Sequence, residues 1–290
     1  METFKNILVP FDFREQAEIA LSQSYNLART TGLRITLLYV HEDGGFLNKF
    51  FSADQSDELI QKMEVELDGF VKEKCKETGL EIDYMVARGK IHTKIVEVAE
   101  MIQAKFIVMG TASSTSPSEN GIGANTSRVI RNAKCPVLTI GSVHHYNGCR
   151  SILLPLDLTK ESRQKVSWAI ELAKMFGSTI KVITVLWSTN HKEIAGTLRA
   201  QVAQVKDFIE ERNVKCSAEI IEVNKESEET PTILNYAKNQ GDVDLIMIMT
   251  QQETGLIPFF VDKQATELIR LSSIPVMSII PKDTGDTLAR

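Results

Sequence analysis

Short apolar runs alternate with longer amphipathic stretches along the whole chain. The first run, residues 7–13, is followed by apolar residues at spacings of three and four, and these end at Gly32; a second run follows at 35–40. Spacings of three and four are typical of a helix with one buried face, and a short apolar run between turn residues is typical of a buried strand. The pattern therefore predicts alternating strands and helices, which build a parallel sheet covered on both faces.

The same pattern occurs twice in the chain. Residues 7–13 read ILVPFDF, and residues 152–158 read ILLPLDL. Four equivalent pairs lie 145 residues apart: Pro10 and Pro155, Asp12 and Asp157, Gly32 and Gly177, Ile35 and Ile180. Toward the end of each half the offset falls to 139 or 140, where KCPV at 134–137 matches SIPV at 273–276. An offset kept across strand, helix and next strand indicates a tandem duplication.

Each half supplies five predicted strands and about four helices. We expect an α/β fold of two tandem doubly wound domains, each a five-stranded, mostly parallel sheet with helices on both faces. The domains are expected at residues 1–143 and 150–282, followed by a polar tail at 283–290. The junction between them contains His144, His145 and Cys149, whose spacing matches no common zinc pattern, so no metal is predicted.

Composition narrows the class of protein. Of the 290 residues, 43% are apolar and 24% charged, which is typical of a globular protein, and the net charge is -5. Nucleic-acid binding needs clustered Lys and Arg, and none is apparent. The N-terminal apolar run is too short for a signal peptide, and no run approaches the length of a membrane span. The four cysteines form no C-x-x-C motif. We therefore expect a cytoplasmic protein with free thiols and neither a nucleic-acid nor a membrane partner.

The stretch from Gly110 to Pro136 carries the candidate chemistry. The apolar run 106–109 ends at Gly110, a small and polar loop follows, and a helical pattern begins after Gly123. Amide groups at a glycine-rich turn before a helix lack intrahelical acceptors, and the helix dipole adds partial positive charge. This arrangement is an anion site of phosphate size, although a surface loop without a ligand would have the same composition.

The spacing in this stretch resembles the nucleotide motif of the universal stress protein family, G-x2-G-x9-G-(S/T). Gly110 and Gly123 keep the register, Ser113 stands at the second glycine, and Ala124 stands at the hydroxyl residue. The opening I-L-V-P-x-D and the closing C-P-V or I-P-V strands are also similar to those of the family, and the resemblance covers both halves.

The resemblance implies ATP or another adenine nucleotide in the N-terminal domain only. The implied site residues are Pro10, Asp12, Tyr39, Val40, Gly89, Gly110, Ser113, Gly123, Ala124, Asn125 and Thr126. Asp12 would approach the nucleoside, residues 39–40 would line the base pocket, Gly89 would flank the base, and the loop would hold the phosphates. Asp12 also fits a turn or helix-capping role.

Two departures from the motif predict weak binding. Ala124 keeps its backbone amide but has no hydroxyl, and a hydrogen bond to a charged phosphate is worth roughly 1.5–3 kcal/mol. Asn125 or Thr126 would substitute for it, or would only cap the helix. Ser113 adds a side chain where the backbone would approach the phosphates.

The second half departs further from the motif. Thr250 is expected in place of the first glycine, and residues 261–263, Val-Asp-Lys, in place of Gly123-Ala124. Asp262 would put a carboxylate beside the phosphates. We therefore expect no ATP binding of the family kind in this half.

No sequence motif for catalysis was found. The chain lacks G-x-x-x-x-G-K-(S/T) and G-x-S-x-G, and no catalytic residue is proposed. The leading hypothesis is a non-enzymatic stress-response protein that binds an adenine nucleotide in its first half. A ligand-free interaction scaffold and, less favoured, a weak nucleotide hydrolase stay open. As in the family, residues 137–140 and 276–280 are expected to pair within one chain as a pseudo-dimer, and a homodimer is left open.

Overall fold

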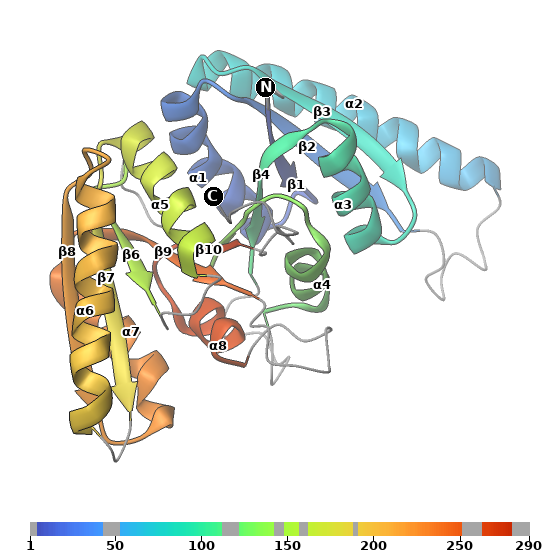
Figure 1. Ribbon diagram of the computed structural model, residues 1–290. Helices are drawn as coiled ribbons and strands as arrows, with labels where there is room; N and C mark the ends of the chain where they lie inside the picture. The colour runs from blue at the N-terminus through green and yellow to red at the C-terminus, as the bar shows by residue number, and fades with distance from the viewer. Residues whose placement is uncertain are drawn as a thin grey trace. The chain divides into compact units, whose positions relative to one another are not determined.

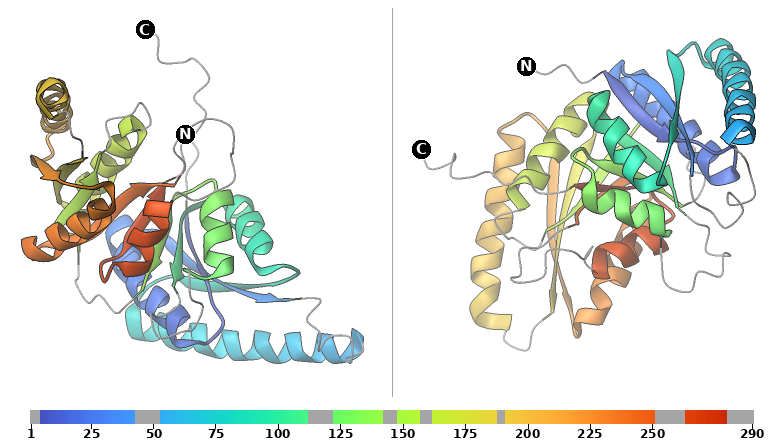
Figure 2. Two further views of the ribbon diagram at one scale, coloured as in Figure 1. Left: turned by 90° about the horizontal axis from the view of Figure 1, so that it is seen from below. Right: turned by 90° about the vertical axis from the view of Figure 1, so that its right-hand side faces the viewer.

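The computed structural model describes residues 5–42, 53–111, 122–141, 148–156, 162–187, 191–250 and 263–279. The chain forms two compact units, which divide between Gly148 and Cys149. Figure 1 and Figure 2 show strands flanked by helices in each unit.

The first unit contains five parallel strands in the order β3-β2-β1-β4-β5. Its elements are β1 (Asn6–Pro10), α1 (Glu15–Thr31), β2 (Arg34–His41), α2 (Ala53–Thr78), β3 (Ile82–Arg88), α3 (Ile91–Met101), β4 (Ala104–Gly110), α4 (Ala124–Asn132) and β5 (Val137–Ile140). Every helix crosses between parallel strands, so the doubly wound arrangement expected from the sequence is confirmed.

The second unit repeats this plan with the strand order β10-β9-β6-β7-β8, again with parallel pairings. Its elements are β6 (Ser151–Pro155), α5 (Ser162–Phe176), β7 (Thr179–Trp187), α6 (His191–Glu210), β8 (Cys216–Val223), a 3-10 turn η2 (Glu226–Glu228), α7 (Glu229–Gln240), β9 (Val243–Met249), α8 (Lys263–Leu271) and β10 (Val276–Ile279).

Burial explains why the central strands read as continuous apolar runs. Residues 7–9 of β1 and 106–108 of β4 have no exposed surface, because helices cover both faces of the sheet. The edge strand β3 is only partly buried along most of its length, and its sequence is accordingly more polar. The helix stops follow the sequence as well: Gly32 adopts φ 67° and donates its amide to the carbonyl of Ala28, a left-handed cap that glycine favours.

Strand register corrects one equivalence between the halves. Gly110 pairs with Ile140 on β5, whereas the residue paired with Ile279 on β10 is Met249. The amide of Thr250 donates to the carbonyl of Ile279, as the amide of Thr111 does to that of Ile140. The counterpart of Gly110 is therefore Met249, and the expectation that Thr250 replaces this glycine is wrong. Matching the apolar runs of the two halves leaves their alignment uncertain by one residue, and the hydrogen bonds between the strands fix it.

None of the helices in the described parts of the chain is both long and apolar enough to cross a membrane.

Candidate functional site

Pro10, Val40 and Gly110 lie at or near the carboxyl ends of three adjacent strands of the first unit. Pro10 at the end of β1 pairs with Leu38 on β2, and the amide of Phe11 donates to the Leu38 carbonyl at 2.9 Å. On the other side of β1 lies β4, which ends at Gly110. The chain runs outward in opposite directions from β1 and β4, and this switch point is where open parallel sheets bind ligands.

Asp12 lies exposed just beyond β1. Its Oδ1 accepts a hydrogen bond from the amide of Arg14 at 3.1 Å, and its Oδ2 lies 3.5 Å from Nε of the same arginine. A hydrogen bond from the backbone amide two residues later to an Asp side chain forms an Asx turn, and this turn leads the chain into α1. The hydrogen bond to the Arg14 amide therefore supports the turn role considered for Asp12. The Asp12 side chain is also 52% exposed, so its carboxylate is accessible to a ligand.

An aromatic cluster beside Asp12 was not foreseen from the sequence. The ring of Phe11 lies 5.0 Å from that of Phe13 and 5.0 Å from that of Phe70 on α2, and the rings of Phe13 and Phe70 are 5.6 Å apart. Phe13 has φ 61°, which is unusual outside glycine, and this packing holds it there. The sequence signal that could have predicted this cluster is the pair of phenylalanines on either side of Asp12.

Gly89 has a backbone role at the end of β3. Its amide donates to the carbonyl of His41 at 2.9 Å, and its φ of 128° lies in a region that side chains rarely adopt. A glycine is therefore needed for this turn, whether or not a base lies against it.

Gly110 allows a close approach between β4 and α1. A Cβ built on it would lie 2.3 Å from the carbonyl oxygen of Gln16, closer than any real contact. This packing requirement accounts for the glycine independently of any phosphate.

The start of α4 offers backbone amides to a ligand. Its first intrahelical bond runs from the amide of Ser127 to the carbonyl of Gly123 at 3.0 Å, so the helix itself supplies no acceptor for the amides of residues 124–126. Gly123 has φ 91°, and no side chain caps the helix there. Ala124 is exposed, while Thr126 is buried, with 7% exposure. Ser113 lies outside the described residues.

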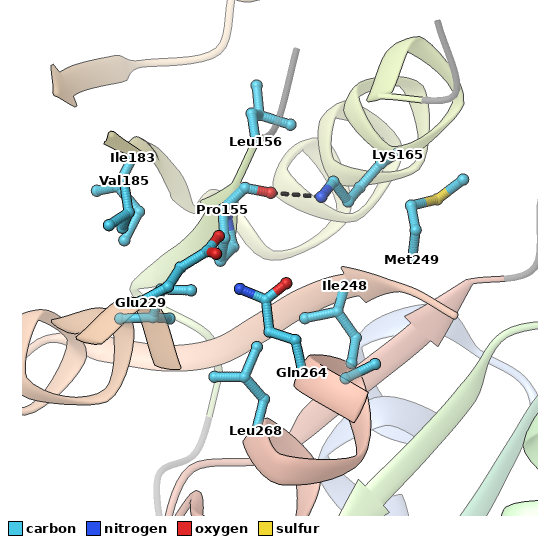
Figure 3. A pocket seen from close by; sticks show the side chains of 12 residues that line it. Pro155, Leu156, Lys165, Ile183, Val185, Glu229, Ile248, Met249, Gln264 and Leu268 are labelled. Carbon is cyan, nitrogen blue, oxygen red and sulfur yellow. Dashed lines mark hydrogen bonds between the residues drawn. The ribbon is translucent and has the colours of Figure 1, made fainter. Parts of the chain in front are cut away.

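The second unit contains a hollow at the corresponding place in its fold (Figure 3). Five of its lining residues, Pro155, Val185, Met249, Gln264 and Ala265, are the counterparts by register of Pro10, Val40, Gly110, Asn125 and Thr126. These five of the eleven candidate residues thus fall on positions around which this fold can form a pocket.

The same correspondence separates the two candidates on β2. Ile183 and Val185, the equivalents of Leu38 and Val40, line the hollow. Because side chains alternate along a strand, Tyr39 points to the opposite face from Val40. By this correspondence Val40 lies on the face that forms the hollow in the second unit and Tyr39 on the other face; that either residue contacts a nucleotide stays a prediction.

The described residues of the second unit also differ chemically from those of the first. Lys165, buried with 6% exposure, stands at the position of Ala20 and donates a hydrogen bond to the carbonyl of Pro155. Asp157 and Asp262 lie outside the described residues. Across the described parts of both units, no group of three or more His, Cys, Asp or Glu side chains could hold a metal ion.

Comparisons with known proteins agree with this architecture. Universal stress protein MJ0531 of Methanocaldococcus jannaschii is 32% identical over 142 residues, which span 47% of this chain and 82% of that protein. MJ0577, a universal stress protein of the same organism, is 26% identical over 154 residues, 47% of this chain and 94% of that protein. The crystal structure of a universal stress protein from Archaeoglobus fulgidus has the same fold, with a TM-score of 0.76 at 17% identity over 97% of both chains.

The model of the universal stress protein family matches the chain twice, at residues 3–141 and 148–279. Each match spans one of the two copies of the duplicated α/β pattern. The chain therefore belongs to the universal stress protein family, as a tandem member with two copies of the family domain.

Proposed function

We propose that this protein is a non-enzymatic stress-response protein that binds an adenine nucleotide in its first unit. The observation that carries the proposal is the placement of Pro10, Val40, Gly110, Asn125 and Thr126. Each occupies a position whose counterpart in the second unit lines a hollow. Family membership makes a nucleotide the natural ligand for such a position.

The roles follow from the chemistry of each group. Val40 offers an apolar surface to the base, and the carboxylate of Asp12 accepts hydrogen bonds from ribose hydroxyls. The amides of residues 124–126 face no intrahelical acceptor and suit phosphate oxygens, which the dipole of α4 also favours. Gly89 and Gly110 act through the backbone, since each allows a conformation or approach that a side chain would prevent.

Titration calorimetry with ATP on the whole chain tests the proposal. We expect weak binding with one site per chain. Ala124→Ser restores the hydroxyl of the family motif at an exposed position and should tighten binding by about tenfold or more. Ala124→Asp puts a carboxylate there and should weaken binding, while α4 tolerates an acidic residue in its first turn.

These two substitutions control for each other, because both leave the backbone unchanged at an exposed site. Gly123→Asp is a poorer test of the phosphate assignment. Its φ of 91° strains any side chain, so the thermal midpoint would also fall. Identical ATP affinity for wild type and both Ala124 variants would refute the phosphate assignment, and no heat at millimolar ATP would favour the ligand-free scaffold. Phosphate release that disappears in Asp12→Ala would favour the hydrolase.

The pairing of residues 137–140 with 276–280 within one chain stays a prediction, as does a homodimer. Sedimentation equilibrium at several protein concentrations distinguishes a monomer from a dimer.

A further inference from the structure

A second hollow in the second unit lies between α6 and the sheet, on the opposite face of the sheet from the hollow of Figure 3. Figure 1 shows α6 running alongside β7 and β8, and α6 contacts both strands. The strand side of this α6 hollow is formed by Leu186 on β7 and by Ala218 and Ile220 on β8, and its helix side includes Val202 and Ala203. Its volume is about 390 Å³, which is within the usual range for a small-molecule site.

The corresponding face of the first unit carries two tyrosines. Strand register makes Tyr84 the counterpart of Ala218, and Tyr39 the counterpart of Thr184. The two tyrosines share one face of the first sheet, because Leu37, two residues before Tyr39, pairs with Tyr84. The second unit therefore has alanine and threonine where the first unit has two aromatic rings, and this loss of side-chain volume accounts for the α6 hollow.

A buried hydroxyl on the same face of the sheet has no partner. Thr184 is 4% exposed, and its Oγ1 makes no hydrogen bond among the described residues. Thr184 pairs with Ile220 and lies two residues before Leu186, so its side chain points to the same face as these two lining residues. An unpaired buried hydroxyl is unfavourable, and a hydroxyl can both donate and accept, so a ligand with one polar group would satisfy it.

The charges at the rim of the α6 hollow favour an uncharged ligand. Arg199 on α6 and Glu222 on β8 both line the hollow and are exposed, and neither has an ion pair within the described part of the chain. Lys206, the other cation of the lining, lies 3.6 Å from the carboxylate of Glu210. The opposite charges offset one another, and the remaining lining surface is apolar.

We propose that the α6 hollow binds a small uncharged aromatic compound that carries one hydroxyl or N–H group, such as a phenol or an indole. The ring of the ligand takes the place that the tyrosine rings have in the first unit, and it packs against Val202, Ala218 and Ile220. The hydroxyl or N–H of the ligand donates a hydrogen bond to Oγ1 of Thr184. This site is separate from the nucleotide site proposed for the first unit.

NMR of the whole chain with isotope-labelled isoleucine methyl groups tests the proposal. The probe is p-cresol, which is the side chain of tyrosine as a free molecule. We expect the methyl signal of Ile220 to shift on addition of p-cresol, with a dissociation constant of about 1 mM. Toluene has the same ring without the hydroxyl, so the ratio of its dissociation constant to that of p-cresol reports on the hydrogen bond to Thr184.

Thr184→Val tests this hydrogen bond. Valine keeps the shape of threonine and removes the hydroxyl, so the ratio for toluene over p-cresol should fall about fivefold. The thermal midpoint without ligand should not fall, because the change removes a polar group that has no partner. Thr197→Val, at an exposed position on α6, is the matched control and should leave the ratio unchanged.

Ala218→Tyr tests the place of binding. The substitution puts into the second unit the side chain that the first unit has at this position, so it should fill the hollow and abolish p-cresol binding. The thermal midpoint shows whether this variant is folded, and the ratio measured on Thr184→Val decides the question if it is not.

The proposal is overturned if p-cresol at about 20 mM does not shift the signal of Ile220, if folded Ala218→Tyr binds p-cresol like wild type, or if Thr184→Val leaves the ratio unchanged. Tighter binding of 4-hydroxyphenylacetate than of p-cresol would also overturn it, since Arg199 would then select an anion. ATP binding in the first unit is measured separately and does not affect any of these results.

Discussion

The backbone carbonyl of Gln16, in the first turn of α1, lies where a side chain of residue 110 would begin. A Cβ on Gly110 would be 2.3 Å from that oxygen and 2.7 Å from its carbon. The end of β4 and the start of α1 are therefore in direct backbone contact, beside the carboxyl ends of the strands.

We predict that Gly110→Ala lowers the free energy of unfolding by about 1–3 kcal/mol. The added methyl group meets backbone rather than a flexible side chain, so α1 or β4 must shift to admit it. Urea unfolding followed by circular dichroism measures the change.

Gly69→Ala is the matched control for this prediction. Gly69 lies inside α2, and apart from its chain neighbours and the backbone of its own helix nothing lies within 4 Å of the place that an added methyl group would take. Alanine should therefore stabilise the protein by roughly 0.5–1 kcal/mol through helix propensity. Equal effects of the two substitutions would show that the carbonyl of Gln16 does not block the place of an added methyl group on Gly110.

Arg150, which is exposed, pairs with the buried Asp244 at the amino ends of β6 and β9. Nε and Nη2 of Arg150 donate to the two carboxylate oxygens at 3.0 and 2.8 Å, and the Arg150 amide donates to the same carboxylate at 2.7 Å. Asp244 is only 2% exposed in its side chain. Removing the guanidinium leaves this carboxylate short of partners, so Arg150→Ala should cost about 1–3 kcal/mol.

A double-mutant cycle measures this interaction. We expect Arg150→Ala combined with Asp244→Ala to cost clearly less than the sum of the single changes, because the second change removes a group that has already lost its partner. Strict additivity in urea unfolding would show that the pair contributes nothing to stability.

Two thiols should react slowly in the folded protein. Burial raises the pKa of Cys149 to about 12, and burial together with the charge of Glu210 raises the pKa of Cys216 to about 12. The thiolate is the reactive form, so at about pH 8 each reacts far more slowly with iodoacetamide than in the unfolded chain. Peptide mass spectrometry after labelling with and without urea measures both rates, and equal rates for Cys149 in the two conditions would contradict its burial.

Alkaline pH should destabilise the first unit through Tyr25. Burial, and then the charge of Glu77, raise its pKa from 10.0 to about 12. A folded pKa above the unfolded value means that this contribution to stability is complete below pH 10 and is lost as the pH rises toward 12. Tyr25→Phe removes the ionisation, so its thermal midpoint should fall less between about pH 9 and pH 11.5 than that of wild type. Parallel curves for the two proteins would refute this.

Much of the fold could be predicted because its signals are local. The apolar runs, the three-and-four spacing and the stops at Gly32 and Gly177 each act within about a dozen residues, and the structure forms its strands and helices where they indicate. The duplication was readable for the same reason, since each copy must satisfy the same local rules.

The candidate site was only partly predictable. Strand periodicity alone separates Tyr39 from Val40, yet deciding which of them faces the pocket required the hollow lined by Val185. The one-residue error at Thr250 has a similar origin, because only the ladder between β9 and β10 sets the register.

The sequence by itself determined the order of strands and helices, the duplication and the glycines that end helices, since these depend on backbone preferences and on the period of apolar residues. Only the tertiary structure decided that Gly110 meets the backbone of Gln16 and that Lys165 lies buried beside Pro155. Both are contacts between separate elements, and their distances depend on how a helix packs on the sheet, which no local pattern specifies.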